Sequence, residues 1–254
     1  MPSFTRRFAL AACATALAPL APLAHAQGAR TLKIGATATG IPFTFLDVKS
    51  NTIQGMMVDT ATAVAKAAGY QVEVQQTVFS ALIPSLTGNK IDVISAAMLK
   101  TAARAEVVDF SSPVYSYGEG LIVKAEDPKA YTSLDELKGE IVGAQVGTVF
   151  LDMLNKKGIF KEVRSYDSVA DMTRDLALGR IKAGLGDQPI MAYQIQQNTF
   201  KGIKLVAGYQ PVNVGDVCLV VRKGDAELLA SLNKAIAAVK ADGTLAAIVK
   251  KWGI

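Results

Sequence analysis

Residues Ile91–Tyr115 read IDVISAAMLKTAARAEVVDFSSPVY. The apolar run that opens this stretch is typical of a short buried strand. Thr101 is a candidate N-cap of a short helix with Arg104 in its first turn. A guanidinium beside a strand end can bind a carboxylate through two parallel hydrogen bonds, so Arg104 is a candidate carboxylate-binding residue. A surface arginine paired with Glu106 or Asp109 explains the same residues, and on the local sequence alone it is the preferred interpretation.

Residues 1–26 predict a secretion signal. Arg6 and Arg7 precede a stretch rich in Ala and Leu, and Ala24-His25-Ala26 has the small-x-small form of a cleavage site. Its removal would leave 228 of the 254 residues and lower the net charge from +5 to +3, because two arginines are lost. The remaining chain is mildly basic without a basic block, so the sequence gives no sign of nucleic-acid binding.

The chain after residue 26 has no histidine, and Cys218 is its only cysteine. No intrachain disulfide is expected, and the usual zinc and Cys–His catalytic sites are excluded. We therefore expect no metal and no cofactor. No apolar stretch after residue 26 is long enough to span a membrane, so we expect a soluble mature product.

Short apolar runs alternate with amphipathic segments along the whole mature chain. This rhythm predicts an α/β protein made of two units, each with a largely parallel sheet. The expected strands are 31–36, 70–75, 91–95, 121–124, 140–145, 181–186, 203–206 and 217–222. The expected helices are 57–68, 80–87, 133–137, 148–157, 168–178, 187–197, 227–240 and 245–252, with 40–47 as a loop and 115–120 as a connecting region. Two such lobes would form a ligand cleft at their strand ends.

Two further turns are candidate binding sites. Gln145-Val146-Gly147-Thr148 joins a strand to a helix, and the free N–H groups there attract anions. A plain turn with Thr148 as helix cap is an equally good interpretation. In Gly186-Asp187-Gln188-Pro189, the carboxylate of Asp187 at a cleft edge can hold an ammonium group. Helix capping alone also explains an Asp followed by Pro in the first turn.

Several motifs in order resemble the family 3 extracellular solute-binding proteins of amino-acid ABC transporters. Met98–Tyr115 is similar to the family's Thr-x-x-Arg … Asp-Phe-Ser-x-Pro-Tyr signature, with Val114 before the tyrosine. Met56 and Met57 replace the usual Phe-Asp of its first helix. The other matching segments are IQGMMVDTATAVA at 53–65, FSALIPSLTGNK at 79–90, 142–148, 185–187 and the Asp-Gly-Thr … Lys-Trp pattern at 240–252.

The resemblance implies a two-lobed periplasmic-binding-protein fold of type II, with mostly parallel sheets flanked by helices. It implies that residues 27–115 and 215–254 form the first lobe and residues 116–214 the second. Arg104 would bind the ligand's α-carboxylate and Asp187 its α-ammonium. The other positions implied in the site are Phe79 and Phe43 in the first lobe, Gln145 near the ligand side chain, and Thr148 with Val149, whose backbone would help hold the carboxylate.

The chain departs from the family pattern around these anchors. Leu99, with Ala97 nearby, stands where a Ser or Thr usually helps to hold the carboxylate. Gly40-Ile41-Pro42-Phe43 lacks the aromatic that usually stacks on the ligand, and Thr37 stands where some relatives carry an acid for basic ligands. A lysine or arginine ligand is therefore disfavoured, and a larger or less polar amino acid, or a different carboxylate, is credible.

Three functions are compatible with these residues. The first, which we favour, is a monomeric periplasmic binding protein that passes an amino acid or related carboxylate to an ABC transporter permease. The second is an enzyme on the same scaffold, similar to cyclohexadienyl dehydratases, although no general acid can be assigned from the sequence. The third is a ligand sensor, which would usually be fused to a membrane segment and a kinase, whereas this chain ends soon after Lys251-Trp252.

Overall fold

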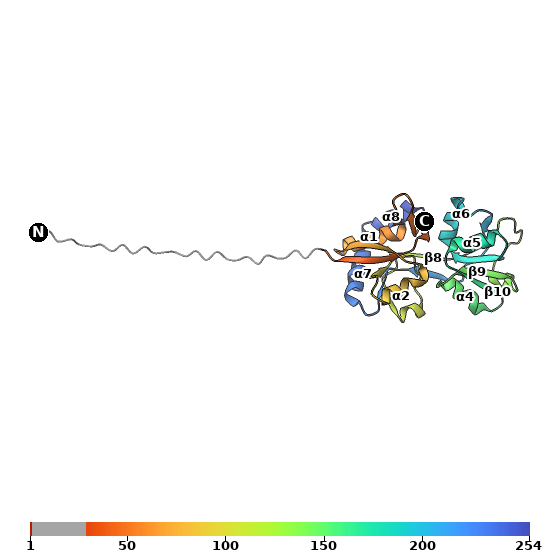
Figure 1. Cartoon of the computed structure of the whole chain (residues 1–254), viewed down its shortest axis with the longest axis horizontal. Coiled ribbons are helices and arrows are strands. Elements are labelled where there is room, and N and C mark those ends of the chain that lie inside the picture. Colours follow the sequence, from red (N-terminus) through yellow and green to blue (C-terminus); the bar gives the residue numbers. More distant parts are fainter. Residues whose placement is uncertain (2–28) are drawn as a thin grey trace.

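The structure is a computed structural model that describes Met1 and residues 29–254. The predicted secretion signal therefore lies outside the described residues. The molecule has two lobes, each an α/β unit with helices packed on a sheet (Figure 1). None of the helices in the described part of the chain is long and apolar enough to cross a membrane.

The first lobe is built on a five-stranded sheet with the strand order β5-β1-β6-β14-β7. Its second strand, β1 (Thr31–Ala36), pairs in parallel with β5 (Gln71–Gln76) and β6 (Val93–Ile94). The sheet is completed by β14 (Val220–Arg222), which runs antiparallel to both β6 and β7 (Val108–Phe110). Leu32 and Ile34 of β1 are buried on one face, and only its last residues, 34–36, are buried on both faces.

Helices cover both faces of this sheet. Helix α1 buries Met57, Ala61 and Val64, which recur at helical spacing. The helices of this lobe are α1 (Met56–Ala67), α2 (Leu82–Thr87), α3 (Ala102–Ala105), α7 (Ala226–Ala241) and α8 (Thr244–Trp252), with a 3-10 turn η1 (Phe79–Ala81). A small antiparallel sheet of β2 (Thr39–Gly40), β3 (Thr44–Asp47) and β4 (Thr52–Gln54) lies between β1 and α1 in the chain.

The second lobe has a mixed sheet with the order β10-β9-β11-β8-β12. Its parallel part joins β9 to both neighbours, and the long strand β8 runs antiparallel to β11 and β12. The strands are β8 (Tyr115–Lys124), β9 (Ile141–Gln145), β10 (Glu162–Tyr166), β11 (Ala183–Asp187) and β12 (Ile203–Leu205). The helices are α4 (Val149–Lys157), α5 (Val169–Ala177) and α6 (Gln188–Gln196), with the 3-10 turn η2 (Leu134–Leu137).

Two strands connect the lobes. The first half of β8 pairs antiparallel with β13 (Val214–Val217), from Tyr115 opposite Val217 to Gly118 opposite Val214. Leu99 of the first lobe forms a further bridge to Val217. Both predicted domain boundaries fall within this ladder, and their positions stay predictions. In Figure 1, β8 runs from one lobe toward the other.

The structure corrects several predicted elements. Residues 115–120, predicted as a connecting region, are the first half of strand β8: 115–118 pair with β13 and 119–120 with β11, despite two glycines. The predicted strand 217–222 is divided between β13 and β14. Strands β7 and β10 were not predicted, since β7 is short and β10 is too polar to show a clear alternation. The predicted loop 40–47 contains β3.

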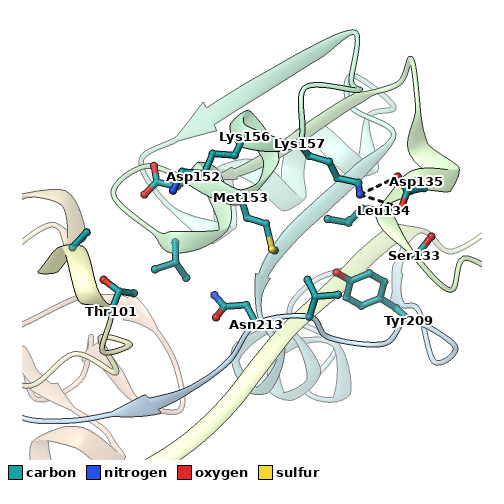
Figure 2. Close-up of a pocket in the computed structure, with 13 residues that line it drawn as sticks. Thr101, Ser133, Leu134, Asp135, Asp152, Met153, Lys156, Lys157, Tyr209 and Asn213 are labelled. Carbon is teal, nitrogen blue, oxygen red and sulfur yellow. Dashed lines mark hydrogen bonds and ion pairs between the residues drawn. The ribbon is translucent and has the colours of Figure 1, made fainter. Parts of the chain in front are cut away.

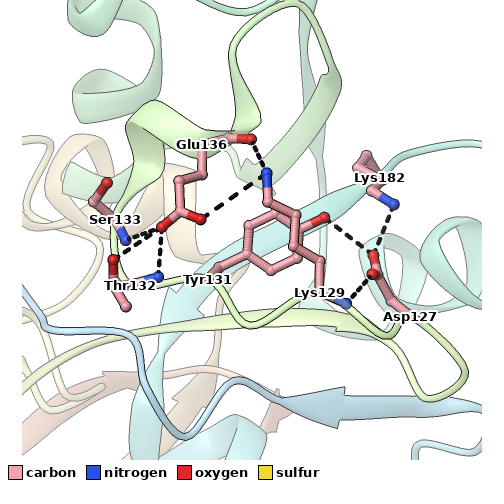
Figure 3. A network of polar contacts seen from close by, with 7 residues as sticks. All are labelled: Asp127, Lys129, Tyr131, Thr132, Ser133, Glu136 and Lys182. Atoms are coloured by element: carbon pink, nitrogen blue, oxygen red, sulfur yellow. Dashed lines mark hydrogen bonds and ion pairs between the residues drawn. The ribbon is translucent and has the colours of Figure 1, made fainter.

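A polar network fixes the turn after β8 in the second lobe (Figure 3). The buried Asp127 carboxylate accepts from Lys182 Nζ at 2.7 Å, Tyr131 Oη at 3.1 Å and the Lys129 amide at 3.0 Å. Burial alone would raise the pKa of Asp127, but these donors, led by Lys182, hold it below its usual value. The turn after β8 is thereby tied to the residue that precedes β11.

Candidate functional site

Arg104 lies in α3, and its guanidinium contacts both lobes. Thr101 caps the helix, with Oγ1 accepting from the Arg104 amide at 3.2 Å, as predicted. The two terminal nitrogens of the guanidinium donate to Leu99 O at 2.6 Å and to Gly147 O, in the second lobe, at 2.9 Å. Its Cζ lies 5.8 Å from the centre of the Phe79 ring. Burial lowers the pKa of Arg104 from its usual value, but a guanidinium stays charged.

Asp187 stands at the N-cap position of α6, yet its side chain makes no capping hydrogen bond. Its Oδ1 instead contacts the hydroxyl of Tyr117 on β8. Burial raises the pKa of Asp187 to about 6, against the opposing effects of Tyr117 and Arg104. Helix capping therefore does not explain this residue, and the carboxylate is available for another partner.

A small cavity between the lobes includes Asp187 in its wall. Its volume is about 20 Å³, which is room for about one water molecule. The lining residues from the first lobe are Thr37, Thr39, Gly40, Phe43, Thr44, Phe79 and Ala96, and those from the second are Gln145, Val169, Asp187 and Ile190. The lobes also touch at Gly147, where an added Cβ would lie 3.0 Å from Ser80 Cα. The molecule is thus in a closed arrangement, and the lobes must separate to admit a solute.

Some of the predicted site residues line the small interlobe cavity, and others lie elsewhere. Asp187, Phe79, Gln145 and Phe43 line the cavity, and Arg104 stands beside it against Phe79. The remaining four predicted residues do not line it. Ala97 and Leu99 contribute backbone carbonyls to Tyr117 and Arg104, Thr148 caps α4 through Leu151 N, and Val149 lines a different cavity. All nine ligand-binding roles stay predictions.

The sequence interpretation missed Tyr117, Val169 and Ile190. Tyr117 is buried, stacks on Phe43 with ring centres 5.6 Å apart, and donates its hydroxyl proton toward Asp187 or toward Ala97 O at 2.9 Å. Alternation along β8 places Tyr115, Tyr117 and Glu119 on one face. That signal was available, but it was lost because this segment was interpreted as a connection.

A larger cavity of about 570 Å³ lies beside the connecting strands (Figure 2). Thr101 and Ala103 of the first lobe, Met153 of α4 and Asn213 before β13 are among its walls. Its charged groups partly neutralise one another, since Lys157 pairs with Asp135 at 2.9 Å. Neither Arg104 nor Asp187 lines it, whereas Asp187 lines the small interlobe cavity and Arg104 stands beside that cavity on the other lobe. This pair of opposite charges favours the small cavity as the candidate ligand site despite its size. Among residues 29–254, no three His, Cys, Asp or Glu side chains are grouped to hold a metal ion.

The model of the bacterial extracellular solute-binding proteins, family 3, matches residues 32–254. The chain belongs to this family. The match covers both lobes and all the residues of the candidate site, so the family 3 fold and the site geometry describe the same part of the chain.

Relatives named as amino-acid-binding proteins are similar over most of this chain. The putative ABC transporter arginine-binding protein 2 of Escherichia coli (strain K12) is 33% identical over 89% of this chain and 92% of its own length. The L-cystine-binding protein TcyJ of the same strain is 30% identical over 87% of this chain and 82% of its own length. Their names give two different amino acids as ligands.

Solved structures of amino-acid-binding proteins are also similar to most of this chain. An ancestral arginine-binding protein bound to arginine has a TM-score of 0.82 and 34% identity, covering 89% of this chain and all of its own. An ancestral arginine-binding protein bound to glutamine has a TM-score of 0.80 and 35% identity, covering 90% and 99%. The ancestral amino acid-binding protein AncCDT-1, a precursor of cyclohexadienyl dehydratase, has a TM-score of 0.78 and 30% identity, covering 87% and 95%.

Proposed function

We propose that this protein captures an α-amino acid in the periplasm and delivers it to the permease of an ABC transporter. The observation that carries the proposal is the placement of opposite charges on the two lobes. Arg104 stands on α3 of the first lobe and Asp187 at the end of β11 in the second, on either side of the line along which the lobes meet. A zwitterion bound by both would join the lobes, so that its capture and lobe closure are one event.

Arg104 already makes the interlobe contact that a bound carboxylate would replace. Two of its five N–H groups donate to Leu99 O and Gly147 O, and a carboxylate is a stronger acceptor than a backbone carbonyl. Each charge-assisted anchor contributes roughly 1.5–3 kcal/mol. Micromolar affinity needs about 8 kcal/mol. The rest must come from burial of the ligand side chain and from lobe closure.

The cavity wall favours a ligand with an uncharged side chain. Asp187 is the one charged residue among those that line the cavity, and its carboxylate would be paired with the ligand's ammonium group. Thr37 and Thr44 hydrogen-bond to each other at 2.6 Å, and Ile190 and Phe43 add apolar surface. A second positive charge, as in arginine or lysine, would be left without a counter-charge at a buried site. We therefore propose a neutral α-amino acid, although several relatives are named as arginine-binding proteins.

A dehydratase activity is the second candidate, because an Asp with a pKa of about 6 can act as a general acid near neutral pH. With arogenate, which carries an ammonium group, Asp187 would have to bind that group and also act as the acid. Turnover of prephenate or arogenate by the purified protein separates the candidates. We expect no product, and a measurable rate would replace the binding function by an enzymatic one.

Thermal unfolding against a panel of amino acids and small carboxylates tests the binding function. A ligand at a thousand times its dissociation constant stabilises by about 4 kcal/mol, which raises the midpoint by about 8–16 °C for a chain of this size. We expect this rise with a neutral L-amino acid and not with its analogue that lacks the ammonium. Asp187→Ala should abolish it. A rise with the deaminated carboxylate alone would remove Asp187 from the site.

A further inference from the structure

The hydroxyl of Tyr117 lies between two hydrogen-bond acceptors. Its Oη contacts Asp187 Oδ1 in the second lobe and is 2.9 Å from Ala97 O in the first. A tyrosine hydroxyl has one proton to donate. If Asp187 were ionised, it and Ala97 O would compete for that proton, and one of them would be left unpaired. If Asp187 is protonated, it donates to Tyr117 Oη, which donates to Ala97 O, and every contact is a hydrogen bond.

The surroundings of both acceptors support the protonated arrangement. Tyr117 is buried and fixed by its stack on Phe43 (5.6 Å between ring centres, 27° between planes), so its hydroxyl cannot move out to water. Ala97 is buried with a φ of 54°, a left-handed conformation uncommon for a residue other than glycine. That conformation belongs to the backbone whose carbonyl accepts from Tyr117. An unpaired carbonyl at such a buried site is costly.

The other charged groups around Asp187 do not supply a strong partner. Arg104, on α3, favours the ionised form by its charge, but its recorded hydrogen bonds go to Leu99 O and Gly147 O. Glu119 is opposite Asp187 in the β8–β11 register, and its carboxylate accepts from Tyr209 Oη and two backbone amides. Helix α6 and the cavity-lining residues at 37–44 carry no charge. Burial therefore outweighs charge at Asp187.

We propose that Asp187, kept neutral by burial under mildly acidic conditions, loses one proton to solvent for each ammonium group captured there, and that Tyr117 is a positioning residue whose hydroxyl stabilises the carboxylate that this step leaves. This inference rests on the proposed function. On binding, the O–H bond of Asp187 breaks and its proton leaves to water. The carboxylate then accepts from the ammonium, and Tyr117 turns its own proton from Ala97 O to Asp187. Capture is thereby linked to pH through a carboxyl group that spans the lobe interface.

The direction of the pH dependence follows because neutral Asp187 cannot form an ion pair with an ammonium group. Affinity should rise about tenfold for each pH unit up to about 6 and level off above it. Calorimetry in two buffers of different ionisation enthalpy measures the protons exchanged. We expect nearly one proton released per ligand at about pH 5 and nearly none at about pH 8.

Tyr117→Phe tests the role of the hydroxyl, because phenylalanine preserves the ring that stacks on Phe43. Without a donor to the carboxylate, burial acts unopposed by Tyr117, and the midpoint of the affinity profile should move up by about one to two pH units. Tyr115→Phe is the matched control. It removes a hydroxyl two residues away on β8, from a ring that meets Phe43 edge-on, and should leave the midpoint unchanged.

Titration of the Asp187 carboxyl carbon by ¹³C NMR in the ligand-free protein gives an independent measurement, with Asp187→Asn identifying the signal. A wild-type midpoint near the usual value of Asp, or the same midpoint in Tyr117→Phe, would overturn the inference. An amino acid that binds at about pH 5 without releasing a proton would overturn it while leaving the proposed function intact. If no amino acid binds at either pH, both fail.

Discussion

At the scale of single residues, the sequence was most informative for charged side chains, whose residue type already indicates which ligand group they can bind. Arg104 and Asp187 were identified by type and position, and the structure places them on opposite lobes beside one interlobe cavity. For Tyr117, the alternation along β8 was the one local signal, and it gives a face of the strand but no partner. The importance of Tyr117 depends on two contacts, with Ala97 O and Asp187, that join segments 20 and 70 residues away in the chain. A local sequence pattern cannot predict contacts between segments so far apart in the chain.

Arg104→Lys tests whether the shape of the guanidinium matters or only its charge. A lysine ammonium preserves the charge but lacks the planar fork that reaches Leu99 O and Gly147 O together and matches a carboxylate. Loss of one charge-assisted hydrogen bond, about 1.5–3 kcal/mol, should weaken ligand affinity about 10- to 150-fold in titration calorimetry. Arg164→Lys, on a surface pair with Glu162, is the control and should change nothing. Equal ligand affinities for both variants would mean that only the positive charge of Arg104 contributes to binding, and not the shape of its guanidinium.

At the scale of elements, periodicity predicted the helices well, because an apolar stripe of twelve or more residues is a strong signal. Helices α1 and α7 begin and end close to the predicted residues. The strands were harder. Strand β10 has a polar composition, and β8 contains two glycines, yet pairing with neighbouring strands overrides these weak local preferences. The connection between the lobes was predicted at 115–120, but the pairing of this segment, which carries Tyr117, as a strand with β13 was not.

The turn after β8 offers a test of stability at this scale. Asp127→Asn removes the charge that pairs with Lys182, so we expect a loss of about 1–3 kcal/mol in urea unfolding at neutral pH. The pKa of Asp127 is lower in the folded state than in the unfolded chain. Its stabilisation is therefore complete above the unfolded value of about 3.9 and is lost as the pH falls through the folded value.

The difference between wild type and Asp127→Asn should accordingly shrink as the pH of the unfolding measurement is lowered below the unfolded-state pKa of Asp. Glu126→Gln is the matched control. Glu126 is the neighbouring residue and pairs with Lys124 at 2.6 Å, but its side chain is 70% exposed. Screening by water should limit its effect to a few tenths of a kcal/mol. A difference for Asp127→Asn that does not vary with pH would assign the effect to packing and not to the ion pair.

At the scale of the whole molecule, function depends on how closely the lobes approach. Gly147 has a φ of 78°, and an added Cβ would lie 3.0 Å from Ser80 Cα in the first lobe. That contact is with backbone, which cannot rotate away. Gly147→Ala should therefore act as a wedge that raises the free energy of the closed arrangement. We expect about tenfold weaker ligand binding, which corresponds to about 1.4 kcal/mol.

The left-handed backbone at Gly147 adds a cost of its own, because alanine tolerates a positive φ poorly, and this must be separated from the wedge. Gly139→Ala makes the separation. Gly139 has a φ of 76°, lies in the same lobe, and has no heavy atom within 4 Å of an added Cβ. Both variants should lose similar thermal stability without ligand, but only Gly147→Ala should lose affinity, mainly through faster ligand release. Equal affinities would mean that the lobes of the ligand-bound protein meet elsewhere, and that the contact between Gly147 and Ser80 belongs to the ligand-free arrangement alone.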